Sequence, residues 1–162
     1  MATRTVKVSW TKSAAYWFKL NTDGSSLGNP GKARGGGLAQ NDRGMWIAGF
    51  TRNIGKATSV EAELWALRDG FFLCKNLNLE AIEIELDAKV VFDWVGGIHC
   101  SNSAHSALIL DSRFLLYQFK QWIKKLVFLK ETMDCRFLKE ILVGFSFLTG
   151  LTILNYKNLQ FK

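Results

Sequence analysis

Apolar and polar side chains alternate along residues 17–23, WFKLNTD, which is the period of a β-strand. Residues 35–42, GGGLAQND, and 45–53, MWIAGFTRN, are the next candidate strands. The NDRG sequence between them suits a tight turn that joins antiparallel strands. The pattern therefore predicts three strands that form an antiparallel meander.

A helical period replaces this alternation in residues 58–76. Apolar side chains recur there every three or four positions, at Val60, Leu64, Leu67, Phe71 and Cys74. Thr58 and Ser59 are both available as the N-cap residue. We therefore predict an amphipathic helix.

Residues 81–87 return to period two, with isoleucine and leucine on one side and acidic residues on the other. This pattern predicts a fourth strand. Residues 88–95 and 106–119 have helical character, and the small polar loop between them contains His99 and His105. The order of elements is typical of an α/β fold with a mixed sheet.

Composition narrows the class of protein. A chain of 162 residues with 48% hydrophobic and 22% charged residues is expected to fold as one domain, which excludes a disordered protein. The first residues contain no apolar run of signal-peptide length. Cys74, Cys100 and Cys135 are far apart and lack metal-ligand spacing. We expect reduced thiols in an intracellular protein of the nucleus or cytoplasm, not a secreted one.

The net charge of +7 is concentrated near the carboxyl end, because residues 120–162 carry five of these charges. Two interpretations stay open for that region, a solvated surface and a surface that binds phosphate. Residues 141–154 form a run of 14 residues without charges. A membrane helix needs about 20. We therefore predict no membrane association. We expect this run either to be buried or to be exposed and prone to aggregation.

Three acidic residues occupy informative places. Asp23 ends the first predicted strand, Asp87 ends the fourth, and Glu63 lies beside the apolar stripe of the first helix. Each has an ordinary structural explanation, respectively a turn residue, an N-cap and an exposed helix glutamate. If the first and fourth strands are neighbours, however, the three carboxylates meet.

Converging carboxylates repel one another and shift their pKa values unless a cation neutralises them. Few hard oxygen ligands, with room left for water and a substrate phosphate, are typical of Mg²⁺ sites. The sequence therefore predicts that Asp23, Glu63 and Asp87 hold Mg²⁺, with Mn²⁺ as the alternative.

Five segments carry a family resemblance: KLNTDGS, GGGLAQNDRGMWIAGF, EAELWALRDG, IEIELDA and LILDSRFLLYQF. Over residues 10–119 the chain resembles plant ribonuclease H type 1 domains, including those related to retroelement reverse transcriptases. The resemblance implies a ribonuclease H-like fold, in which three antiparallel strands and then a parallel strand are flanked by helices. It implies Asp23, Glu63 and Asp87 as the catalytic, metal-binding residues and leaves Glu61 outside the site.

The resemblance also implies an activity. Members of this family cleave the RNA strand of RNA–DNA hybrids with two metal ions, which hold the attacking water and the leaving oxygen. The expected partner is an RNA–DNA hybrid, and the expected products are a 5′-phosphate and a 3′-hydroxyl. We expect the protein to act as a monomer.

The resemblance ends at Phe119. We therefore predict an extension at residues 1–14, a ribonuclease H-like domain at 15–119 that lacks its final strand, and a divergent tail at 120–162. The fourth carboxylate of the family pattern is missing, and Asp134 is a weakly supported substitute. One hypothesis is a frameshift, because a shifted reading of residues 132–138 can spell QWTADFL. The alternative to an active enzyme is an inactive domain that still binds nucleic acid.

Overall fold

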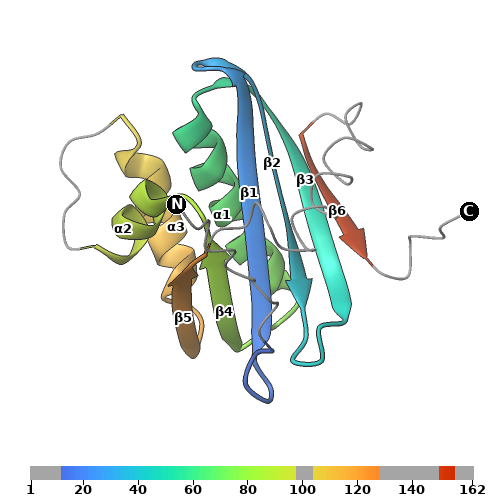
Figure 1. Cartoon of the computed structure of the whole chain (residues 1–162). Helices are drawn as coiled ribbons and strands as arrows, with labels where there is room; N and C mark the ends of the chain where they lie inside the picture. The colour runs from blue at the N-terminus through green and yellow to red at the C-terminus, as the bar shows by residue number, and fades with distance from the viewer. Residues whose placement is uncertain (1–11, 98–103, 128–149, 156–162) are drawn as a thin grey trace, which may run out of the picture.

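The computed structural model describes residues 12–97, 104–127 and 150–155. These residues form one mixed β-sheet with helices packed against it (Figure 1). The α/β architecture predicted from the sequence is therefore confirmed.

The first three strands form the predicted meander: β1 (Phe18–Gly28), β2 (Gly31–Gln40) and β3 (Trp46–Ala57). Both pairings are antiparallel. β1 continues beyond the predicted strand end, and a turn of only two residues joins it to β2. The glycines after Asp23 therefore lie mostly within strands. Their low strand propensity hid the second half of β1 and the first residues of β2 in the sequence.

The predicted amphipathic helix is α1 (Ser59–Asn76), and Thr58 is its N-cap. Glu61 N donates to Thr58 Oγ1 at 3.2 Å, and Thr58 N donates to Glu61 Oε2 at 2.7 Å, which completes a capping box. The backbone hydrogen bond from Thr58 lowers the pKa of the Glu61 carboxyl. Glu61 thus stabilises the start of the helix.

The fourth predicted strand is β4 (Ala81–Leu86), which pairs parallel to β1. The two predicted helices after it are α2 (Lys89–Gly96) and α3 (Ser106–Leu116). α3 packs against both α1 and α2. Within the described ranges, no helix combines the length and the apolar character that crossing a membrane requires.

The expectation that the final strand is missing is wrong. β5 (Gln121–Leu126) lies in the region assigned to the divergent tail and pairs parallel to β4. Its pattern, QWIKKL, does not alternate, because β5 is an edge strand whose side chains are mostly exposed. Trp122 packs against the main core, and Lys125 Nζ lies 2.9 Å from Glu83 Oε1.

A second part of the tail also joins the sheet. β6 (Leu151–Asn155) pairs antiparallel with β3, so the strand order is β5-β4-β1-β2-β3-β6 (Figure 1). β6 includes the end of the uncharged run at 141–154. Most of that run, together with Asp134, lies outside the described residues.

The main core lies between α1 and the sheet. The apolar stripe of α1 packs there against β1 and β4, and the members at the centre are Leu20, Leu64, Leu67, Phe71, Ile82 and Ile84. All six are at most 1% exposed. Burial of these side chains, each worth about 1.5–3 kcal/mol, holds α1 on the sheet.

Charged residues are buried on the other face of the sheet. Lys19 Nζ lies 2.7 Å from Glu85 Oε1 and 3.6 Å from Glu83 Oε1. The side chain of Lys19 is 0% exposed, that of Glu85 is 9% exposed and that of Glu83 is 3% exposed. Such a network costs desolvation energy and is retained only when the charges are paired closely. The network connects β1 to β4 along the length over which the two strands pair.

Candidate metal centre

The site lies at a notch in the sheet. β1 pairs with β4 only through Phe18–Asn21, so the edge of β1 beyond Asn21 is not covered by β4. Asp23 lies two residues past the last pair, and Asp87 follows the end of β4 directly. The end of the β1–β4 pairing and the end of β4 thus bring two acidic residues to one place.

The third acidic residue comes from the start of α1. Glu63 Oε2 accepts a hydrogen bond from Gly24 N at 3.0 Å. This backbone donor is available because Gly24 lies in the part of β1 that β4 leaves uncovered. The bond fixes the glutamate side chain beside β1.

Gly24 is required for this contact. A Cβ atom added there would lie 2.2 Å from the backbone carbon of Ala62 and 2.3 Å from Glu63 N. Real Cβ contacts are never so short, so any side chain at this position would displace α1 from β1. The glycine after Asp23 therefore serves close packing between backbones.

Small residues continue this contact along α1. Ala62, Ala66 and Gly70 are spaced by four residues and share one helix face. A Cβ on Gly35 would lie 3.1 Å from the Ala66 Cβ, and a Cβ on Gly70 would lie 2.8 Å from the Thr22 Cγ2. The helix is thus held close to the sheet along more than two turns.

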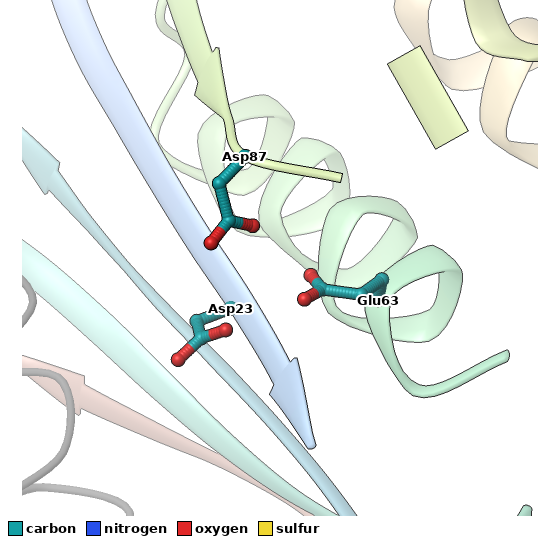
Figure 2. A group of neighbouring side chains, drawn as sticks. All are labelled: Asp23, Glu63 and Asp87. Atoms are coloured by element: carbon teal, nitrogen blue, oxygen red, sulfur yellow. The ribbon is translucent and has the colours of Figure 1, made fainter. Parts of the chain in front are cut away.

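The structure places the three predicted carboxylates together. Asp23, Glu63 and Asp87 each offer one oxygen, and these oxygens all lie within 4.8 Å of one another. Figure 2 shows the three side chains converging from β1, α1 and the end of β4. All three are half-buried. A site of this size suits a divalent cation with part of its coordination left for water or substrate.

Electrostatics support the same interpretation. Burial, followed by repulsion from Asp23 and Asp87, raises the pKa of Glu63 from 4.5 to about 9. The hydrogen bond from Gly24 N opposes this shift but does not cancel it. At neutral pH, Glu63 therefore holds a proton unless a cation takes its place. The three carboxylate oxygens are suitable ligands for a divalent metal ion, and such an ion would relieve the repulsion among them.

Of the two histidines, His105 lies among the described residues, and its printed contacts are with residues outside this cluster. His105 Nδ1 is 3.6 Å from Glu61 Oε1, and the His105 ring lies 5.5 Å from the ring of Trp94. His99 lies outside the described residues. His105 therefore contacts the N-terminal end of α1 through its capping glutamate.

The chain belongs to the reverse transcriptase-like family, whose profile matches residues 21–131. It is similar to an Arabidopsis thaliana protein named as a ribonuclease H protein, with 33% identity over 121 residues. The match covers 74% of this chain and 19% of that protein. The chain thus spans about a fifth of the length of this relative.

Solved structures share the fold. Ribonuclease H1 from Halobacterium salinarum NRC-1 is 28% identical over 68% of this chain and 85% of its own, with a TM-score of 0.65. The N-terminal ribonuclease H domain of a Mycobacterium tuberculosis protein is 24% identical over 76% and 97%, with a TM-score of 0.68. The predicted ribonuclease H-like fold and the plant ribonuclease H resemblance are confirmed.

Replacing Gly24 by alanine tests the close contact. We expect Gly24→Ala to lower the free energy of unfolding by about 3 kcal/mol, because α1 must move away from β1. Urea denaturation measures this change. The matched control is Ser25→Ala at the next, exposed position, which should change stability by less than about 0.5 kcal/mol. Equal stability of the two variants would contradict the packing argument.

The raised pKa of Glu63 predicts how stability depends on pH. Folded protein binds this proton more tightly than unfolded protein, so without metal its stability falls as pH rises from 4.5 to about 9. Asp23→Asn removes the larger of the two repulsions and leaves the burial of Glu63 in place, so this fall in stability should become smaller. Thermal denaturation in EDTA at several pH values measures the slope.

Mg²⁺ should restore the stability of the wild type at high pH, and this effect should be lost in Asp23→Asn. Glu80→Gln, which alters an exposed ion pair with Lys120, is the matched control. It should retain both the slope and the response to Mg²⁺. A wild-type protein that shows no slope in EDTA would refute the electrostatic argument.

Proposed function

We propose that this domain hydrolyses the RNA strand of RNA–DNA hybrids in a reaction that requires a divalent metal ion. The observation that carries the proposal is the convergence of Asp23, Glu63 and Asp87 within 4.8 Å at the notch between β1 and β4. The family membership and the ribonuclease H fold support the same reaction class.

Asp23, Glu63 and Asp87 would hold the metal, with Mg²⁺ as the expected ion and Mn²⁺ as the substitute. A pair of such ions supplies an activated water nucleophile and stabilises the charge on the leaving oxygen. The protein would hold the three carboxylates in fixed positions, because Asp23 extends from β1, Glu63 from α1 and Asp87 from the end of β4. Gly24 N–H fixes the orientation of the Glu63 carboxylate.

Selection of RNA would depend on the 2′-hydroxyl, which the wide and shallow minor groove of a hybrid presents to the protein. One structural neighbour, LC11 ribonuclease H1, was solved in complex with an RNA/DNA hybrid. Its identity to this chain is 16%, with a TM-score of 0.66, so the likeness concerns the fold. The hybrid is therefore proposed as the substrate here from the resemblance to ribonuclease H proteins together with the carboxylate site.

A second function remains open, namely binding of nucleic acid without cleavage. It is favoured by the tail sequence, which lacks the fourth carboxylate that the family pattern places after the fifth strand. Three carboxylate ligands would bind a metal ion less tightly than four. The loss would be greater for a pair of ions than for a single ion. The frameshift hypothesis for residues 120–162 stays a prediction that sequencing of the transcript can test.

Cleavage of a labelled hybrid separates the two functions. Wild-type protein with Mg²⁺ should cut the RNA strand, and EDTA should abolish cutting. Asp23→Asn should lower the rate at least about 100-fold, since even residues that only support metal ligands contribute 10–100-fold. Glu80→Gln should cut at the wild-type rate.

Two results would contradict the cleavage proposal. Cutting that persists in EDTA or in Asp23→Asn would indicate a contaminating nuclease. Hybrid binding by the wild type without cutting would support the second function, and its affinity should fall with added salt.

A further inference from the structure

Asn21 is the last residue of β1 that pairs with β4. The side chain is fully buried, and neither Oδ1 nor Nδ2 makes a hydrogen bond within the part of the chain that the structure describes. Alternation along β1 places Asn21 on the same side of the strand as Asp23, two positions earlier. A buried carboxamide without hydrogen bonds therefore lies two positions before Asp23 on the same side of β1.

This residue is costly to the fold. A buried amide without partners costs about 1–3 kcal/mol, whereas an apolar side chain of similar shape avoids that cost. Such groups persist where they have a task other than stability. Asn21 is therefore a candidate for a role in the site that its strand supports.

The strand register defines the neighbours of Asn21. On β2 the opposite residue is Leu38, an apolar side chain that cannot accept a hydrogen bond. On β4 the opposite residue is Glu85, whose carboxylate is paired with Lys19 at 2.7 Å. The next acidic residue along β1 on the same side is Asp23, a member of the cluster.

We propose that Asn21 is a positioning residue of the metal centre, which donates a hydrogen bond from Nδ2 to the Asp23 carboxylate, directly or through one water, when a divalent cation is bound. This inference rests on the proposed function. A metal-ligating carboxylate uses one oxygen for the cation, and a donor to its other oxygen fixes its rotamer. The carboxamide is neutral, so it does this without adding charge.

The buried position of Asn21 suits such a role. Residues packed within a strand vary little in position, and the ion pair of Lys19 with Glu85 holds β4 in register at the same level. The bond would restrict Asp23 at the point where β1 loses its β4 neighbour. Asn21 would thereby act on the proposed site through Asp23, without contacting substrate or metal.

Two variants that are isosteric with each other test this inference. Asn21→Val removes the donor, and Asn21→Thr has the shape of valine but carries a hydroxyl donor. Without metal, Asn21→Val should unfold at the same temperature as the wild type or above it, since no hydrogen bond is lost. Its affinity for Mn²⁺, measured by electron paramagnetic resonance of the free ion, should fall about 10–100-fold. Asn21→Thr should recover part of that affinity.

Thr22→Val is the matched control. Thr22 is also fully buried with an unbonded hydroxyl, but it lies on the side of β1 that faces α1. This variant should bind Mn²⁺ as the wild type does. If Asn21→Val also keeps wild-type affinity, or if Thr22→Val loses as much, the inference is overturned while the metal site stands. If the wild type binds no Mn²⁺, the inference and the proposed function are both overturned.

Discussion

The contact between the backbones of α1 and β1 is the constraint on which the site depends. Gly24 meets Ala62 and Glu63 at a separation that no side chain at position 24 would permit. The same separation allows Gly24 N to hold the Glu63 carboxylate. A packing requirement and a requirement of the site therefore fall on one glycine. The small residues along α1 extend this contact, and the apolar core behind them makes it stable.

The site also depends on the notch in the sheet between β1 and β4. Because β4 ends before β1 does, the edge of β1 is open where Asp23 lies. An open edge is normally a liability, since its backbone groups lack partners. Here one of those groups binds Glu63, and the space is used by three carboxylates. Their mutual repulsion is the cost of a site that a cation can stabilise.

The carboxyl-terminal part of the chain contributes more than its sequence indicates. β5 extends the sheet beside β4, and β6 extends it beside β3. The family profile runs to residue 131, past the point where recognisable motifs end. A strand with exposed side chains carries a weak sequence signal, because most of its stabilisation comes from backbone pairing. The sheet therefore contains two strands, β5 and β6, that the sequence motifs did not indicate.

The sequence by itself determined the order of the elements up to α3 and the candidate carboxylates, because periodicity is a local property that is clear in residues 17–23 and 81–87. It placed the end of the first strand too early, since β1 continues past Asp23 to Gly28. It did not reveal β5, since an edge strand need not alternate. Nor did it show why glycine follows Asp23 or that Asn21 is buried without hydrogen bonds, because both facts depend on residues distant along the chain. Only the tertiary structure decided these points, because close approach and burial arise when separate segments pack together.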